Sequence, residues 1–110
     1  MNEPDKQEYE KVISSYYGED EVNAIISIKV DTKDADKIAM SVASLDNIID
    51  LFLVTGDTDI LAKARFASYK DLKNFVLNKL SEINGIKETK TLMVVTTFKE
   101  GGKLITQGEA

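Results

Sequence analysis

The apolar residues of this chain recur with two different periods, and the order of those periods constrains the fold more than any other feature. Residues 22–31 alternate apolar and polar side chains, which is typical of a strand, and residues 34–44 carry the three-and-four spacing of a helix. Two strand-like segments follow at 48–55 and 59–67. A second helical stripe and a strand-like segment at 87–99 complete the pattern. The predicted order is therefore βαββαβ.

This order predicts an α+β fold of the ferredoxin-like kind. Right-handed crossovers place both helices on one face of an antiparallel sheet. Residues 56–58 form the short, glycine-containing link that an antiparallel hairpin requires. Ser68 followed by Asp71 predicts a capped start for the second helix, and Gly85 stands where that helix should end.

The two ends of the chain carry weaker patterns. Residues 1–21 are expected to form an acidic extension with one short helix, and residues 22–110 a single domain. The helix is predicted from apolar residues at helical spacing, namely Tyr9, Val12, Ile13, Tyr16 and Tyr17. Gly101 and Gly102 predict a turn into a short fifth strand at 104–106.

Composition argues against several classes of function. The chain has no cysteine and no histidine, so thiolate chemistry, the commonest general base and the commonest metal ligand are all missing. We therefore expect no catalytic residue, no metal and no cofactor. No apolar run approaches the roughly 18 residues that span a bilayer, and the first residues lack the pattern of a secretion signal. A cytoplasmic protein without membrane contact is expected.

The net charge of −5 is unevenly distributed. Residues 1–21 hold seven acids and two lysines, whereas the rest of the chain holds equal numbers of acids and bases. A neutral body lacks the basic surface that contacts phosphates in nucleic-acid binders. We therefore expect no direct binding to nucleic acid.

The predicted sheet contains more apolar residues than two helices can cover. By strict alternation, the second strand is apolar on both faces, with Ile48, Phe52 and Val54 on one and Ile49, Leu51 and Leu53 on the other. Soluble monomers rarely expose apolar patches of this size. We expect the uncovered face to pack on a second copy of the chain. The alternative is a cover formed by the N-terminal helix or the C-terminal tail.

Three stretches of sequence carry a resemblance to a known family. Residues 54–61 contain the pattern Thr-Gly-x-x-Asp, residues 85–91 read Gly-Ile-x-x-Thr-x-Thr, and Lys99 stands at the end of the last predicted strand. In this order and spacing, residues 22–99 resemble the effector-binding domain of the Lrp/AsnC transcriptional regulators, also called the RAM domain.

The resemblance implies a function in ligand sensing. Family members usually begin with a helix-turn-helix, but the 21 residues before the first predicted strand are too few for three helices. The chain is thus expected to be a stand-alone sensor that binds a small amino-acid-like effector between subunits. The family forms dimers through its sheets and octamer-like rings. The implied partners are the chain itself and a full-length regulator, through which it would modulate transcription.

The candidate effector site combines the hairpin with the last strand. Its residues are Thr55, Gly56, Asp57, Thr58, Asp59, Thr89 and Thr91. Backbone N–H groups around Gly56 can bind a carboxylate, and a carboxylate of Asp57 or Asp59 can accept hydrogen bonds from an ammonium. Threonine hydroxyls can complete a polar lining. An ordinary hairpin and ordinary strand threonines would show the same residues.

Two other functions remain open. Enzymes of the dimeric α/β-barrel type use the same βαββαβ unit, although this chain offers only Asp, Glu, Tyr, Asn and Lys for catalysis. A large internal pocket enclosing a carboxylate of strongly raised pKa would favour that class. A purely structural oligomerisation module that has lost its effector site would have the same sequence features.

Overall fold

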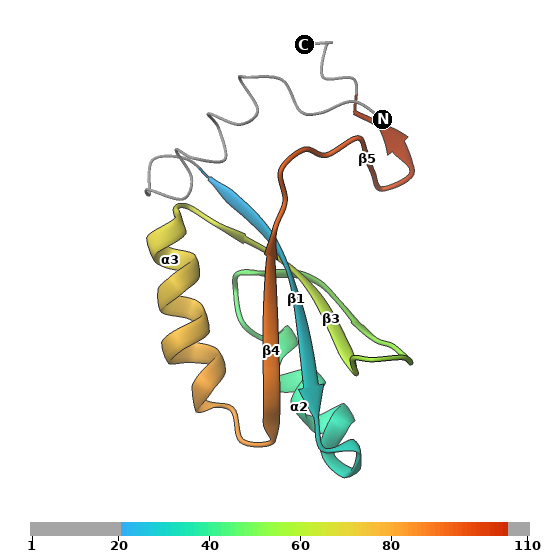
Figure 1. Cartoon of the computed structure of the whole chain (residues 1–110), viewed down its shortest axis with the longest axis vertical. Coiled ribbons are helices and arrows are strands. Elements are labelled where there is room, and N and C mark those ends of the chain that lie inside the picture. The colour runs from blue at the N-terminus through green and yellow to red at the C-terminus, as the bar shows by residue number, and fades with distance from the viewer. Residues whose placement is uncertain (1–20, 106–110) are drawn as a thin grey trace.

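A computed structural model describes residues 21–105 of the chain (Figure 1). In chain order its elements are β1 (Val22–Val30), η1 (Thr32–Asp34), α2 (Ala35–Ala43), β2 (Ile48–Leu53), β3 (Ile60–Phe66), α3 (Tyr69–Asn74), η2 (Phe75–Lys79), η3 (Leu80–Glu82), β4 (Ile86–Met93), β5 (Lys99–Glu100) and β6 (Lys103–Leu104). The expected helix around residues 9–17 lies outside the described residues. No helix within residues 21–105 has the length and apolar character needed to cross a membrane.

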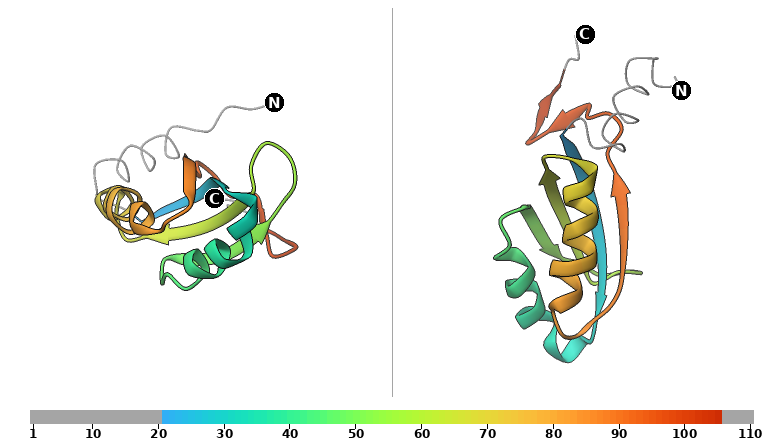
Figure 2. Two further views of the ribbon diagram at one scale, coloured as in Figure 1. Left: turned by 90° about the horizontal axis from the view of Figure 1, so that it is seen from below. Right: turned by 90° about the vertical axis from the view of Figure 1, so that its left-hand side faces the viewer.

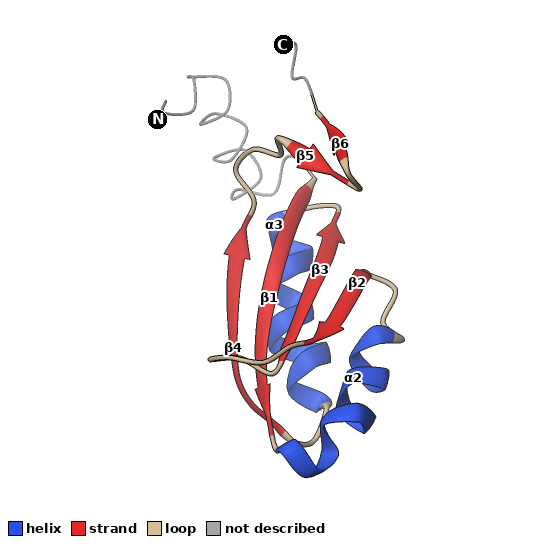
Figure 3. Cartoon of the chain, turned by 90° about the vertical axis from the view of Figure 1, so that its right-hand side faces the viewer, coloured by secondary structure: helices blue, strands red, loops and turns tan. Residues whose placement is uncertain are grey.

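The main sheet is antiparallel and has four strands in the order β2-β3-β1-β4. Both helical segments lie on one face of it. They stand in front of the sheet in the right-hand view of Figure 2 and behind it in Figure 3, which shows the opposite side. The predicted ferredoxin-like α+β fold is confirmed.

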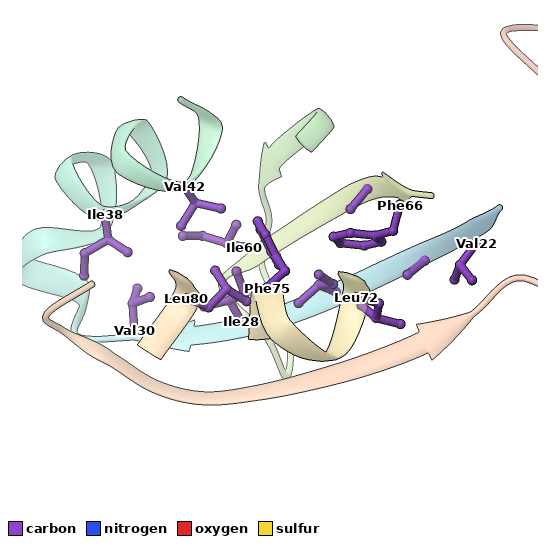
Figure 4. Packing of buried hydrophobic residues seen from close by; sticks show 13 residues of the cluster. Val22, Ile28, Val30, Ile38, Val42, Ile60, Phe66, Leu72, Phe75 and Leu80 are labelled. Atoms are coloured by element: carbon purple, nitrogen blue, oxygen red, sulfur yellow. The ribbon is translucent and has the colours of Figure 1, made fainter. Parts of the chain in front are cut away.

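The core lies between the sheet and the helices (Figure 4). The alternation in β1 buries one side of the central strand completely, since Ile26 and Ile28 are inaccessible to solvent. Opposite them on β3 stand Ala62 and Ile60, which are also fully buried. Burial of these side chains is the main favourable contribution to folding.

The second helical segment begins where the sequence predicts. The Ser68 hydroxyl accepts a hydrogen bond from the backbone N–H of Asp71 at 3.2 Å, which confirms the expected cap. The segment then widens into the π-helical turn η2, where the N–H of Leu80 bonds to the carbonyl of Phe75. This wider turn keeps Phe75 and Leu80, five positions apart, on the buried side.

The faces predicted for the second strand are partly wrong. A β-bulge shifts the register between Ile48 and Asp50. Ile48 and Leu51 therefore both pack against the core, although strict alternation places them on opposite faces. Phe52 lies opposite Leu61 and faces away from the helices.

The last strand is shorter than predicted. β4 ends at Met93, and the N–H of Val94 makes a final hydrogen bond of 2.8 Å to Asn23 at the start of β1. The pairing of β4 with β1 ends there, close to the first residue of β1, and the chain leaves the sheet. Residues 94–105, named here the C-terminal arm, end in the separate β5–β6 hairpin. The expected fifth strand exists as Lys103–Leu104, outside the main sheet.

Candidate functional site

One face of the main sheet is not covered by helices, and we call it the open face. It is defined by the side chains of Asn23, Ile25, Ser27, Phe52, Leu61, Lys63, Lys90 and Leu92, which alternate with the core residues. Phe52 and Leu92 expose 52% and 56% of their surface. The open face is therefore a mixed surface in which large apolar side chains meet solvent.

The hairpin loop between β2 and β3, residues 54–59, projects from the open face (Figures 1 and 3). Two of its side chains hold it against β1. The Thr58 hydroxyl accepts a hydrogen bond from Ser27 at 2.7 Å and donates one to the carbonyl of Ile28 at 3.0 Å. The Asp59 carboxylate accepts a hydrogen bond of 3.0 Å from the N–H of Val30.

These contacts divide the predicted hairpin residues into two groups. Thr58 and Asp59 are half-buried and engaged within the chain. Thr55, Gly56 and Asp57 are exposed, and the carboxylate of Asp57 has no hydrogen bond or ion pair with any residue between 21 and 105. A Cβ placed on Gly56 would have no atom within 4 Å, so its backbone is open to approach. The free groups are thus one carboxylate and the N–H groups beside it.

The two predicted threonines of the last strand lie elsewhere. Thr89 and Thr91 stand opposite Ile28 and Ile26 on β1 and therefore face the helices. The hairpin lies on the other side of the sheet, bonded to Ser27. Within one chain the structure does not bring these threonines to the hairpin.

A cavity that sequence reasoning missed lies at the other end of the open face. The C-terminal arm crosses above β1 and β3 there and encloses a volume of about 260 Å³, named here the arm cavity. Its polar lining includes Asn23, Lys63, Arg65, Thr96 and Lys99. No local motif predicts it, because its walls come from separate segments spread between Asn23 and Glu100.

One ion pair links the arm to the sheet at this cavity, and further polar contacts lie beside it. The Lys63 ammonium lies 3.3 Å from the carboxylate of Glu100 on the arm and 3.7 Å from that of Asp50 on β2. Arg65 donates a hydrogen bond of 3.0 Å to the side chain of Asn23. All these pairs are solvent-exposed, so each contributes at most about 1 kcal/mol to stability.

Among residues 21–105 no three His, Cys, Asp or Glu side chains come together in a way that could hold an ion. At the hairpin, the carboxylate of Asp57 and the backbone N–H groups beside it can bind a charged ligand through hydrogen bonds.

Comparison with curated proteins gives HTH-type transcriptional regulators as similar chains. An HTH-type transcriptional regulator of Pyrococcus furiosus is 33% identical over 82 residues, which cover 74% of this chain and 55% of the relative. YugG, an HTH-type transcriptional regulator of Bacillus subtilis, is 29% identical over 117 residues, covering 96% of this chain and 70% of the relative. The chain spans about half the length of most curated relatives it matches.

Solved structures share the fold. A transcriptional regulator of Neisseria meningitidis in complex with L-Met superposes with a TM-score of 0.68 at 26% identity, covering 81% of this chain and 59% of that one. AsnC of Escherichia coli gives a TM-score of 0.67 at 23% identity, covering 88% and 61%.

The family model for the Lrp/AsnC ligand binding domain matches residues 23–104, which include all four strands of the sheet, both helical segments and most of the C-terminal arm. The relatives described above are transcriptional regulators, and the enzyme alternative is set aside on that ground. As the sequence resemblance predicted, the chain belongs to the Lrp/AsnC ligand-binding domain family.

Proposed function

We propose that this domain senses a small amino-acid-like effector and passes the signal to transcription through the assembly of subunits in the cytoplasm. The observation that carries this proposal is the hairpin of residues 54–59, which is fixed to β1 while the carboxylate of Asp57 stays unpaired. Family membership and the L-Met complex of the Neisseria relative support it. Residues 22–110 form the sensing domain, and residues 1–21 an acidic extension.

The chemistry of the hairpin suits a zwitterion. Asp57 can accept charge-assisted hydrogen bonds from an ammonium group. The N–H groups around Gly56 can donate to a carboxylate, since no side chain blocks their approach. Thr58 and Asp59 then act as anchors that hold the loop in place, and Thr55 lies beside the free backbone.

Assembly through the open face fits its exposed apolar residues. Phe52 and Leu92 would be buried if two open faces met, as in a two-fold symmetric dimer. Such dimers can associate further, into an octamer-like ring or with a full-length regulator. Thr89 and Thr91 face the helices, so pairing through the open face does not bring them to an effector at the hairpin.

A thermal-shift screen of the twenty amino acids against the full chain tests the sensing proposal. A ligand at 100 times its Kd should add about 2.7 kcal/mol to the stability of the folded state. Asp57→Asn should remove most of this gain, because the neutral amide attracts an ammonium less strongly. Asp46→Asn, an exposed acid in the turn before β2, is the matched control and should keep the gain.

A structural oligomerisation module is the second candidate. It is favoured by the hydrogen bonds of Thr58 and Asp59, which hold the hairpin in place without any ligand. An assembled protein that no amino acid stabilises would establish this candidate over the sensor.

A further inference from the structure

The five asparagines within residues 21–105 differ in how their side chains are held. Two of them form hydrogen bonds with Arg65, at 3.0 and 2.9 Å, and two bond to each other along the second helical segment, in the order Asn23, Asn47, Asn74 and Asn78. The side chain of Asn84 makes no hydrogen bond to any residue in this part of the chain. Its amide group can therefore change its orientation more freely than the other four.

Asn84 also precedes the residue that hinders an internal reaction least. It is followed by Gly85, whereas the other four asparagines are followed by Ala24, Ile48, Phe75 and Lys79. Glycine has no side chain to obstruct the approach of its backbone nitrogen to Cγ of the preceding asparagine. Both Asn84 and Gly85 are exposed to solvent, in the turn that leads from the second helical segment into β4 (Figure 1). A free amide, an accessible backbone nitrogen and water thus meet at this turn.

We propose that the chain deamidates at Asn84 without an enzyme. Asparagine is among the residue types that are chemically labile. The backbone nitrogen of Gly85 loses its proton and bonds to Cγ of Asn84, the side-chain nitrogen leaves as ammonia, and a five-membered imide forms. Water then opens the imide at one of its two carbonyls. The reaction consumes one water and releases one ammonia, and no oxidant or reductant takes part.

The two ways of opening the imide give different main chains. Cleavage of the new bond to Cγ gives aspartate at position 84, with the original backbone path. Cleavage at the former backbone carbonyl gives isoaspartate, in which the main chain runs through Cβ and Cγ and is one carbon atom longer. The first product adds only a charge, whereas the second also changes the length of the turn.

The turn has little room for a longer main chain. An atom placed at the Cβ position of Gly85 would lie 2.5 Å from Cδ1 of the buried Ile38. The carbonyl of Gly85 accepts a hydrogen bond of 3.4 Å from the N–H of Asp31, just beyond the end of β1. An additional carbon atom directly before Gly85 must shift it against these neighbours. Isoaspartate should therefore destabilise the domain, independently of effector binding and of assembly.

Incubation of the full chain at mildly alkaline pH, followed by peptide mapping with mass spectrometry, tests the modification. The peptide that contains Asn84 should gain about 1 Da, the difference between an amide and a carboxyl group, before the peptides of the other four asparagines do. A higher pH should speed the gain, because the attacking nitrogen must lose its proton. Asp-N protease, which cuts before aspartate and not before isoaspartate, separates the two products.

Asn84→Gln is the test variant, because its side chain is one carbon longer and would have to close a less favourable six-membered ring. Its peptide should keep its mass over the time in which the natural chain converts. Asn78→Gln is the matched control, since Asn78 is also exposed but lies in η2. This control should convert at Asn84 as fast as the natural chain.

Urea denaturation tests the structural consequence. The natural chain after incubation, enriched in isoaspartate, should unfold at a lower urea concentration than the fresh chain. Fresh Asn84→Asp should unfold close to the fresh natural chain, because it carries the new charge without the longer backbone.

Three results would overturn the inference. If the Asn84 peptide keeps its mass while another asparagine converts, the site is wrong. If Asn84→Gln gains mass as fast as the natural chain, the imide route is wrong. If the fresh and the isoaspartate-containing chains unfold at the same urea concentration, the turn tolerates the longer main chain and the proposed destabilisation is wrong.

Discussion

Gly85 joins the second helical segment to β4 in a backbone conformation that other residues rarely adopt. Its φ is +98°, and an added Cβ would lie 2.5 Å from Cδ1 of the buried Ile38 on α2. The glycine therefore serves two purposes, a left-handed turn and a close approach of this turn to α2. Sequence alone predicted the first of these from its position after the helical stripe.

Gly85→Ala should destabilise the protein by about 2 kcal/mol, through the positive φ and the displacement of Ile38. The free energy of unfolding, measured in urea, checks this value. Gly101→Ala is the control, because φ is +60° there but an added Cβ meets no atom within 4 Å. Gly101→Ala should lower the free energy of unfolding clearly less than Gly85→Ala does. Equal decreases for the two variants would show that the contact with Ile38 does not contribute to the destabilisation.

At the scale of elements, the second helical segment depends on its cap. Ser68→Ala removes the acceptor for the N–H of Asp71 and should lower the stability by about 1 kcal/mol. Urea denaturation again supplies the measurement. Ser44→Ala is the matched control, because that hydroxyl donates to the carbonyl of Ser41 at an exposed helix end and caps no N–H group. If Ser68→Ala lowers the stability no more than Ser44→Ala does, the capping role of Ser68 is contradicted.

The edge strands show how far element boundaries depend on their neighbours. β4 ends at Met93, which pairs with Ala24 near the start of β1, its neighbour in the sheet that residues 21–105 form. The apolar alternation of the sequence continues beyond that point, which is why the prediction extended the strand to residue 99. Alternation reports which side chains prefer burial, but pairing requires a neighbouring strand.

At the scale of the whole molecule, the open face should govern assembly. Leu92→Asp places a charge beside Ile25 on that face and should shift the protein towards monomer in light scattering, because an unpaired charge would be buried in the interface. Leu77→Asp is the matched control on the helical side, since the two leucines expose 56% and 59% of their surface. Dissociation by the control alone would place the interface on the helices instead.

Local patterns in the sequence determined much of this protein. The order of the elements, the Ser68 cap, the helix end before Gly85 and the position of the hairpin all depend on residues a few positions apart. Such short-range preferences are set by backbone geometry and side-chain spacing, which the sequence displays directly. The family motifs at residues 54–61 and 85–91 are likewise formed by residues a few positions apart.

Only the tertiary structure decided which functional groups are free. Thr58 and Asp59 have their partners 31 and 29 positions away in β1, so the sequence could not show that they anchor the hairpin while Asp57 remains unpaired. The bulge at Ile48 and the arm cavity also arise from contacts between segments that are distant in the sequence. Each depends on which segments the sheet brings side by side, and long-range pairing leaves no local pattern from which it could be predicted.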